Sequence, residues 1–348
     1  MNEENVIGTN VDSAPQPNSM AGTIGQIKTE RGCKSVCEIV KEVQEIIKKD
    51  QETDQKKDQR DSSEDDKATY WFRGEARNYA DSSGSDIGTE FQPCLYRKKN
   101  WVKNEREIYE AALRLNIVSF AEDTRMSERV ARMQHYGLPT RFCDISDNAL
   151  LSAFFAADTE GADGNADGFI RVIKVAGHKM KSFTSDIIVA ISYLPLVDID
   201  RIKMFTKNGL AALTYEIANG DRPWFYSESE NPNAGKRLKK ELQQVWAFRP
   251  ILNNRRIRAQ GGAFLAFGCG SGKAQLDATF SPADYDDETK PTYGIKQIGF
   301  VRIAAHSKAD IRKELRHFGV PEEAVYPDLE NVCTSIKGRF GDKKRRLK

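Results

Sequence analysis

The sequence has few cysteines, no long apolar run and almost no excess of charge of either sign. Its six cysteines are spread over 348 residues, which is too sparse for a disulfide scaffold in a chain of this length. We therefore expect reduced thiols and a cytoplasmic location. Cys33 and Cys37 are close together, but no second Cys/His pair with matching spacing accompanies them. Because a structural zinc site needs four such ligands, no metal site is predicted.

The lack of a long apolar run argues against a membrane-spanning helix. The longest apolar stretch runs from Ala149 to Ala157 and is interrupted by Ser152, whereas a membrane helix needs about 20 apolar residues. The first residues, Met-Asn-Glu-Glu, have neither the basic start nor the apolar segment of a secretory signal. We expect neither a membrane partner nor export.

The charges nearly cancel, since 53 Lys and Arg face 51 Asp and Glu and leave a net charge of +2. Bulk charge therefore does not indicate a strongly basic nucleic-acid binder. A basic cluster stands at 343–346, where a solvated terminus is the simpler interpretation. The weakest functional alternative is a nucleic-acid partner bound by this cluster, with a stacking surface made by Arg222, Trp224, Phe225 and Tyr226.

Composition divides the chain into four segments. Residues 1–34 are polar, rich in Asn, Ser, Gly and Pro, and are expected to form a disordered leader. Residues 35–67 begin with apolar side chains at three-and-four spacing, which predicts an amphipathic helix to about Lys49. A mixed-charge run follows and is interpreted as a solvated linker or a frayed helix end. Residues 68–335 are predicted to form one large domain and 336–348 a basic tail.

The pattern within residues 68–335 mixes helices and strands without regular alternation. Strands are predicted at 69–74, 168–175, 262–267 and 295–304, where β-branched and aromatic residues gather. Helices are predicted at 105–120, from Ser127 to a stop at Gly137, at 149–157 after a cap at Asp147, at 186–194 and at 308–318. The predicted fold class is α+β: a mixed sheet with flanking helices after the leader.

Three motifs together point to a family. They are Trp71-Phe72-Arg73-Gly74, the string from Met133 to Asp144 (MQHYGLPTRFCD), and the stretch from Arg256 to Phe264 (RIRAQGGAF). In this order they resemble the FRG domain family, which takes its name from a Phe-Arg-Gly motif. The stretch from Ala305 to Leu329 is similar to the end of that domain, so the resemblance covers about residues 35–335. After Thr140-Arg141 the family usually reads Leu-Leu-Asp-Trp-Thr, whereas this chain reads Phe-Cys-Asp-Ile-Ser and keeps the Asp.

The Arg73-Gly74 pair suggests an anion-binding strand. A guanidinium offers a planar fork to phosphate, and a glycine lets a ligand approach the backbone. The same short pattern is similar to the first strand of Arg-type ADP-ribosyltransferases, which implies NAD as a substrate. Under this hypothesis Arg73 contacts NAD, His135 and Tyr136 flank the cleft, and Arg141 and Asp144 hold the site from the next element.

Cleavage of the bond to nicotinamide would pass through an oxocarbenium-like species that a carboxylate stabilises. The late strand near position 260 offers Gln260, which carries no charge, so Asp144, Glu75 or Glu241 would have to supply the carboxylate. The candidate catalytic residues are Arg73, His135, Asp144 and Gln260. The candidate cofactor-binding residues are Arg73, Gly74, Tyr136 and Arg141.

Structural roles explain the same residues without any ligand. Arg73, Arg141 and Asp144 would then form a buried ion-pair network, and His135 would be satisfied within the core. Gly74, Gly137 and Gly262 would serve turn geometry, and Cys143 is not expected to be a nucleophile. The leading hypothesis is a polar cleft that binds a nucleotide-like ligand, with NAD as a candidate substrate. The alternative is a non-catalytic recognition module for a protein or nucleic-acid partner, in which the cleft holds a phosphate-bearing polymer or a peptide and the N-terminal helix docks a second protein.

Overall fold

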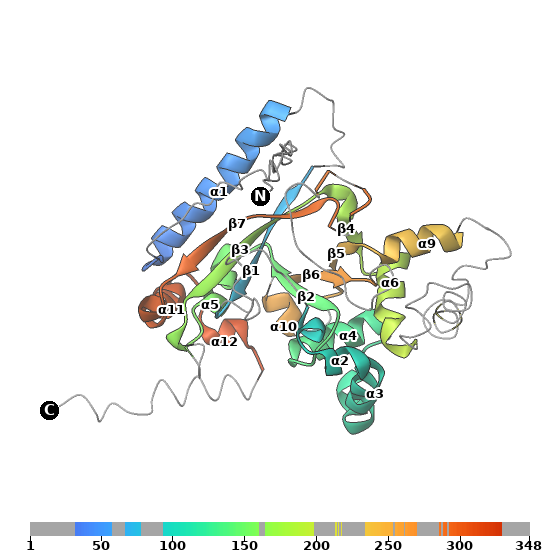
Figure 1. Ribbon diagram of the computed structural model, residues 1–348. Helices are drawn as coiled ribbons and strands as arrows, with labels where there is room; N and C mark the ends of the chain where they lie inside the picture. Colours follow the sequence, from blue (N-terminus) through green and yellow to red (C-terminus); the bar gives the residue numbers. More distant parts are fainter. Residues whose placement is uncertain are drawn as a thin grey trace, which may run out of the picture.

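A computed structural model gives the arrangement of the chain (Figure 1). The structure describes residues 32–57, 67–77, 93–159, 164–197, 213, 215, 217, 234–252, 255–260, 262–269, 285–286, 288–290 and 292–328. Residues 1–31 of the leader expected at 1–34, residues 58–66 of the expected linker, the aromatic stretch at 222–226 and the basic tail lie outside the described residues.

One mixed sheet organises the described chain. Its seven strands follow the order β4-β5-β6-β2-β1-β3-β7. In chain order they are β1 (Thr69–Glu75), β2 (Phe142–Ser146), β3 (Gly168–Val175), β4 (Met180–Ser182), β5 (Val245–Arg249), β6 (Gly262–Phe267) and β7 (Ile295–Ile303). The β4–β5 pair is parallel and the other pairs are antiparallel. The predicted α+β class with a mixed sheet is therefore confirmed.

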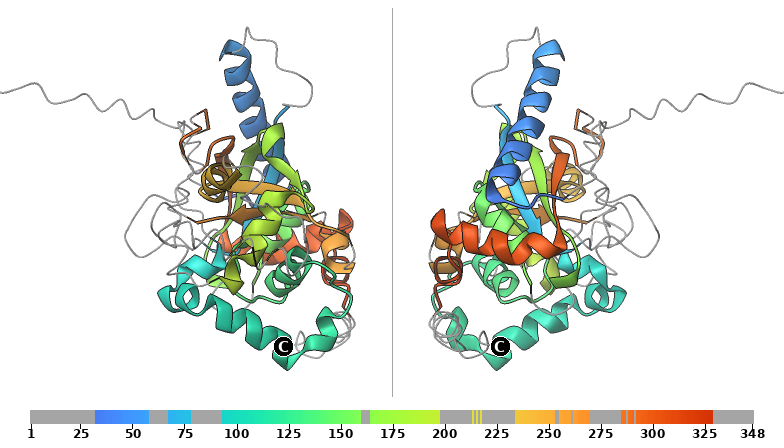
Figure 2. Two further views of the ribbon diagram at one scale, coloured as in Figure 1. Left: turned by 90° about the vertical axis from the view of Figure 1, so that its right-hand side faces the viewer. Right: turned by 90° about the vertical axis from the view of Figure 1, so that its left-hand side faces the viewer.

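One end of the sheet is covered by helices from both ends of the chain. They are α1 (Val36–Lys57), α5 (Ala149–Ala156), α11 (Lys308–His317) and α12 (Glu322–Val325). Figures 1 and 2 show α1 and α11 lying against the strands at the β7 edge. Their buried apolar residues join those of β1, β3 and β7 in one cluster, which includes Ile39, Phe72, Phe154 and Ile311.

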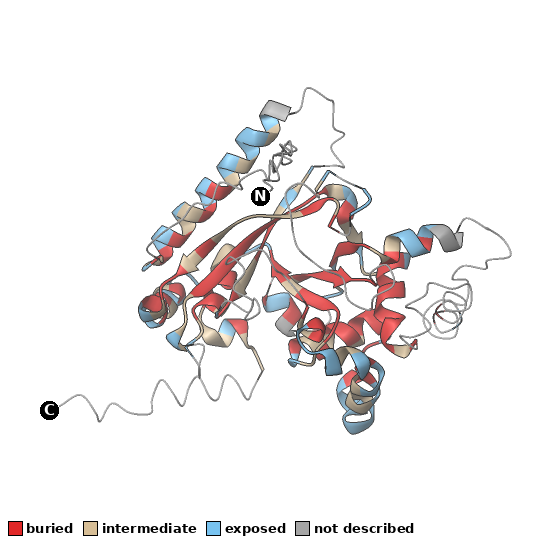
Figure 3. Ribbon diagram, viewed as in Figure 1, coloured by how far each residue is buried: buried red, intermediate tan, exposed pale blue. Residues whose placement is uncertain are grey.

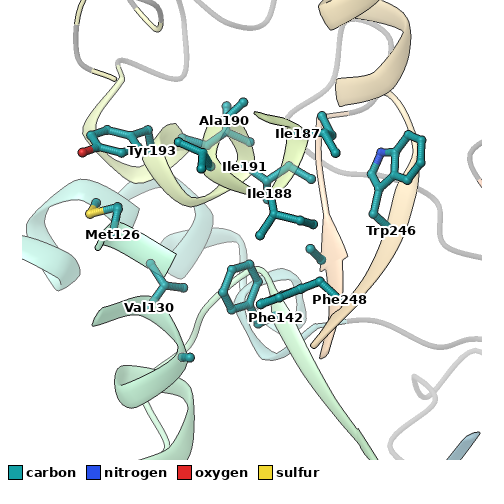
Figure 4. Packing of buried hydrophobic residues seen from close by; sticks show 14 of the residues in the cluster. Met126, Val130, Phe142, Ile187, Ile188, Ala190, Ile191, Tyr193, Trp246 and Phe248 are labelled. Carbon is teal, nitrogen blue, oxygen red and sulfur yellow. The ribbon is translucent and has the colours of Figure 1, made fainter. Parts of the chain in front are cut away.

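A second group of helices covers the other end of the sheet. It contains α3 (Glu105–Leu115), α4 (Met126–His135), α6 (Asp186–Tyr193), α9 (Ala234–Leu242) and α10 (Arg255–Ala259). Figure 4 shows α4 and α6 packing around Phe142 of β2 and Phe248 of β5. Phe72 pairs with Ser146, so Phe72, Ser146 and Phe142 lie on the same face of the sheet. Both helix groups therefore cover this face, which we call the helical face.

The opposite face carries a third apolar cluster that includes Trp71, Cys143, Ile145 and Phe267. Leu95 and Tyr96 pack into it from a short 3-10 turn at Cys94–Arg97, which precedes α2 (Lys99–Lys103). Figure 3 shows β2, β3, β5 and β6 buried along most of their length, whereas most residues of β4 and β7 are intermediate. The sheet is thus the centre of a single domain.

Most predicted elements are present within a few residues of their expected bounds. Gly137 has a φ of 80° and follows the end of α4, as its predicted role in stopping the helix requires. The cap of α5 is different: the side chain of Asn148, not of Asp147, accepts hydrogen bonds from the amides of Leu150 and Leu151. The amides of the first turn have no partner within the helix, and a side-chain acceptor directly before this turn reaches them best.

Helix α1 is longer than predicted and belongs to the core. Its apolar side packs on β7 and α5, so this side is not free to dock a protein partner. The helix continues to Lys57 because Asp50, in the run expected to be a linker, pairs with two lysines of the sheet. Its carboxylate lies 2.9 Å from the Nζ atoms of both Lys174 and Lys296. No helix among the described residues is long and apolar enough to cross a membrane.

Candidate functional site

Asp144 lies in the middle of β2, where the two helix groups meet on the helical face. It pairs with Phe264 of β6 and shares its face with Phe142 and Ser146. Phe142 belongs to the cluster of one helix group, and Phe72, which pairs with Ser146, belongs to that of the other. The side chain of Asp144 is 40% exposed. A carboxylate is thus presented at the boundary between the two groups.

Arg73 reaches Asp144 from the opposite face of the sheet. The register between the fully described strands β1 and β2 pairs Phe72 with Ser146 alone, so the strands separate beyond this position. The Nη1 atom of Arg73 donates to the backbone carbonyl of Asp144 at 2.9 Å and lies 3.9 Å from its Oδ2. The guanidinium therefore bridges the two strands where backbone pairing ends.

Gln134 at the end of α4 holds the same carboxylate, and Thr140 in the following loop holds Gln134. The Nε2 atom of Gln134 donates to Asp144 Oδ2 at 3.0 Å. The hydroxyl of Thr140 donates to Gln134 Oε1 at 2.7 Å and accepts from the backbone amide of Phe142 at 3.1 Å. Sequence reasoning did not assign either residue a role, although both stand within the motif from Met133 to Asp144.

His135 lies beside Asp144 but is buried. Its side chain is 4% exposed, and Nδ1 is 3.8 Å from Asp144 Oδ1, which is too long for a hydrogen bond. The ring meets the ring of Phe264 edge-on with centroids 5.5 Å apart. Oδ1 itself is buried and accepts no hydrogen bond from the described residues. Oδ2 is therefore the ordered acceptor of the site, and His135 backs the carboxylate from the core.

Glu75 is committed to arginines and is not available to a ligand. Its two oxygens lie 3.3 Å from Arg73 Nε and 2.8 Å from Arg171 Nε. Burial opposes the charge of Glu75, but the charges of Arg171 and Arg73 and the hydrogen bond from Arg171 outweigh it and hold the pKa below its usual range. Glu241, the third carboxylate considered, lies on α9 and pairs with Arg237 at 2.8 Å.

Arg73 was predicted to contact NAD from an anion-binding strand, and the structure gives its guanidinium a largely buried environment. Its side chain is 14% exposed and is shared between Glu75 and Asp144. Burial opposes its charge, yet the neighbouring acidic groups raise its pKa above the usual range. Arg73 therefore orders the site and is not an open phosphate receptor.

Arg141 was predicted to hold the ligand site, but it is a core residue. Its side chain is 2% exposed and binds both carboxylate oxygens of Glu105, with Nε–Oε1 and Nη2–Oε2 distances of 2.7 and 2.6 Å. Nη1 donates to the hydroxyl of Tyr96 and to the carbonyl of Gly268. This fork is saturated, so Arg141 serves the fold.

Gly74 was predicted to allow a ligand near the backbone, but packing explains it. A Cβ atom at this position would lie 1.9 Å from the carbonyl oxygen of Ser152 in α5. The glycine therefore lets α5 lie directly on β1. Tyr136, predicted to contact the ligand, directly follows His135 and is 61% exposed, so its ring is accessible.

Gln260 lies in a turn between α10 and β6 and not in the predicted strand. Its Nε2 atom donates to the carbonyl of Val325 at 3.4 Å. Its own carbonyl accepts from the hydroxyl of Ser146, two residues beyond Asp144, at 3.0 Å. The structure thus brings Arg73, His135 and Asp144 together, while the side chain of Gln260 points to α12.

Two further predictions concern chemistry at other groups. Cys143 is fully buried, and burial raises the pKa of its thiol to about 12, which fits the expectation that it is not a nucleophile. Among the described residues, no cluster of three or more His, Cys, Asp and Glu side chains is arranged to hold a metal ion. Two small cavities lie elsewhere: one between α3, α4 and α6, and the other beside β5. Neither is lined by Arg73, His135 or Asp144.

Comparison with known families gives one match, to the FRG domain, over residues 68–164. Comparisons with curated proteins and with solved structures give no match. The matched segment contains β1, α4 and β2, and with them Arg73, Gln134, Thr140 and Asp144. The part of the resemblance beyond residue 164 stays a prediction. Residues 68–164 of this chain are therefore similar to the FRG domain.

Proposed function

We propose that the Asp144 site binds a nucleotide-like ligand through its sugar hydroxyls. The observation that carries this proposal is the half-exposed carboxylate of Asp144, whose Oδ2 atom is held by Gln134 at 3.0 Å with Arg73 at 3.9 Å. An ionised carboxylate is a pure acceptor. It therefore suits the hydroxyl donors of a ribose, as acidic residues do in dinucleotide-binding sites.

The surroundings of Asp144 favour a sugar over a phosphate at this position. Arg73 is shared with Glu75, and Arg141 is saturated by Glu105. A phosphate would meet the Asp144 carboxylate before it met an uncommitted guanidinium, and like charges repel. The exposed ring of Tyr136 offers a flat apolar surface for a base or a nicotinamide ring.

NAD is the candidate substrate because the ribose beside nicotinamide becomes cationic when its glycosidic bond breaks. The C1′–N bond would release neutral nicotinamide with both bonding electrons. An oxygen of water or of an acceptor hydroxyl would then bond to C1′ and lose its proton. Asp144 would stabilise the cationic sugar by charge. Glu75 and Glu241 are paired with arginines, so Asp144 is the candidate catalytic carboxylate.

Calorimetric titration of NAD into the wild type, Asp144→Asn and Asp310→Asn tests the proposal. Asp310 is an exposed carboxylate of α11 that pairs only locally, with Lys313, and serves as a matched control. We expect the wild type and Asp310→Asn to bind alike. Asp144→Asn should bind at least about tenfold more weakly, because a hydrogen bond to a charged group contributes about 1.5–3 kcal/mol. No heat with any protein, or equal affinity in all three, would refute NAD binding at this site.

Release of nicotinamide separates catalysis from recognition. We expect the wild type to release nicotinamide during incubation with NAD, and Asp144→Asn to release at least about 100-fold less, because the charge that stabilises the transition state is lost. NAD binding without any release would favour the alternative of a non-catalytic recognition module at the same site.

A further inference from the structure

We propose that Thr140 and Gln134 are positioning residues that orient Asp144 Oδ2 and thereby set the preference of the site for a hydrogen-bond donor. This inference rests on the proposed function, because it names what the site selects in its ligand. It is carried by a chain of three hydrogen bonds that runs from the backbone of β2 back to the carboxylate on the same strand.

The direction of this chain follows from the backbone. The amide of Phe142 is a fixed donor, and it donates to the Thr140 hydroxyl oxygen at 3.1 Å. A hydroxyl has a single proton, and Thr140 directs it to Gln134 Oε1 at 2.7 Å. Thr140 is buried, so solvent does not compete strongly for either bond. The hydroxyl therefore marks which end of the Gln134 amide carries the oxygen.

The orientation of the Gln134 amide then determines what Asp144 meets. With Oε1 bound to Thr140, the NH₂ group faces Asp144 and donates to Oδ2 at 3.0 Å. A flipped amide would place an oxygen against the carboxylate, and two acceptors cannot share a hydrogen bond. Asp144 is therefore held as an acceptor and faces the ligand in that state.

Selectivity for a donor follows from this arrangement. Gln134 and Arg73 lie against Oδ2, and His135 lies behind Oδ1 in the core. The carboxylate rotamer is thus fixed from several directions, and Oδ2 keeps lone-pair capacity for a hydroxyl of the ligand. A bound sugar that lacks this hydroxyl would cover the open side of Oδ2 without offering it a second donor, which is costly. The site should therefore discriminate against a sugar that lacks the hydroxyl.

The test compares Thr140→Val, Thr140→Ser and Gln134→Met with the wild type. Thr140→Val keeps the shape of the side chain but removes the hydroxyl, whereas Thr140→Ser keeps the hydroxyl. We expect Thr140→Val and Gln134→Met to weaken NAD binding by about three- to tenfold, which corresponds to one hydrogen bond. Thr140→Ser should stay within about twofold of the wild type. In the Asp144→Asn background, Thr140→Val should have no further effect on affinity.

A second measurement needs no ligand and separates failure of this inference from failure of the proposed function. The side-chain amide signals of Gln134 in an NMR spectrum report its hydrogen bonds directly. We expect them to shift in Thr140→Val and to keep their position in Thr140→Ser, with thermal unfolding of both variants as the folding control. Unchanged Gln134 signals in Thr140→Val would overturn the inference. Shifted signals together with no NAD binding by the wild type would keep the positioning role and refute the NAD proposal.

Discussion

Two arginines within residues 68–164, Arg73 and Arg141, differ in how far their acidic partners are exposed to solvent. Arg141 is sealed in the core and donates to Glu105, Tyr96 and a backbone carbonyl. Arg73 bridges two separating strands and ends beside the Asp144 carboxylate, which is 40% exposed. Both arginines have acidic partners, but only the pair of Arg73 with Asp144 reaches solvent.

The comparison shows how to separate a structural ion pair from a functional one. Removing one member of a fully buried pair leaves an uncompensated charge in the core and costs stability. Removing the charge from a half-exposed carboxylate costs little stability but abolishes an acceptor for a ligand. Loss of the Arg141–Glu105 pair should therefore appear as lower stability in unfolding experiments. Loss of the Asp144 charge should appear as weaker ligand binding.

The largest effect is expected for Glu105→Ala, which leaves Arg141 buried and unpaired. The free energy of unfolding should fall by roughly 3–5 kcal/mol, measured by urea denaturation. Glu110 lies on the same helix and forms an exposed pair with Arg106, so Glu110→Ala is the matched control and should change stability by less than about 0.5 kcal/mol. Similar losses in both variants would show that the buried pair of Arg141 with Glu105 stabilises the fold no more than an exposed pair does.

Gly74→Ala should be the next most damaging change, because the new methyl group would overlap the Ser152 carbonyl of α5. We expect a loss of about 1–3 kcal/mol, typical of overpacking, in the same denaturation assay. At Gly262 a Cβ atom would meet its nearest neighbour at 3.8 Å, so Gly262→Ala is a control that should be tolerated. A stable Gly74→Ala variant would show that the close approach of α5 to β1 is not required.

We expect the free energy of unfolding to depend on pH through Lys179, independently of both arginines. It is fully buried, its Nζ lies 2.6 Å from Gln244 Oε1, and burial, with a smaller contribution from Lys181, lowers its pKa from 10.5 to about 7. Between these two values the unfolded chain binds the extra proton, so stability should rise as the pH increases from about 7. The slope from one proton is at most about 1.4 kcal/mol per pH unit.

Denaturation at several pH values checks this dependence. Lys179→Met should flatten the profile above pH 7, whereas Lys313→Met, at an exposed position of α11, should leave it unchanged. The same rise in Lys179→Met as in the wild type would show that the proton is not bound at Lys179.

The smallest change in stability is expected for Asp144→Asn. Its nearest guanidinium atom is 3.9 Å from Oδ2, and the side chain is 40% exposed, so the free energy of unfolding should change by less than about 1 kcal/mol. The measurement is the same urea denaturation, run beside the binding assay. A loss as large as that of Glu105→Ala would place Asp144 among the structural ion pairs.

Local patterns predicted the elements of the fold better than the partners of its charged groups. The stop at Gly137 and strand β1 follow from neighbouring residues, and both are confirmed. The burial of Arg141 depends on Glu105, which lies 36 residues away, and no local pattern reports such a pairing. Strand β2 was not predicted, because its five residues pair with a strand more than a hundred residues later and local spacing does not report such pairing.

The candidate site was predictable to a similar degree. The motif from Met133 to Asp144 contained Gln134, His135 and Thr140, which lie around the carboxylate together with Arg73, but their roles depend on geometry. Gln134 gains its role from a hydroxyl six residues away. Gln260 was assigned to the late strand, whereas that strand begins at Gly262. Spacing alone does not show which way a side chain points at a strand end.

The most direct test of the contrast between the two arginines is an NMR titration of the wild type with NAD, observed at the arginine Nε–H and glutamine side-chain signals. With NAD at saturation, the signals of Gln134 and of Arg73 should move, because both groups hold the Asp144 carboxylate, while the Arg141 signal stays in place in its sealed pair with Glu105. Shifts at Arg141 with none at Gln134 or Arg73, or no shift at any of them, would contradict the account.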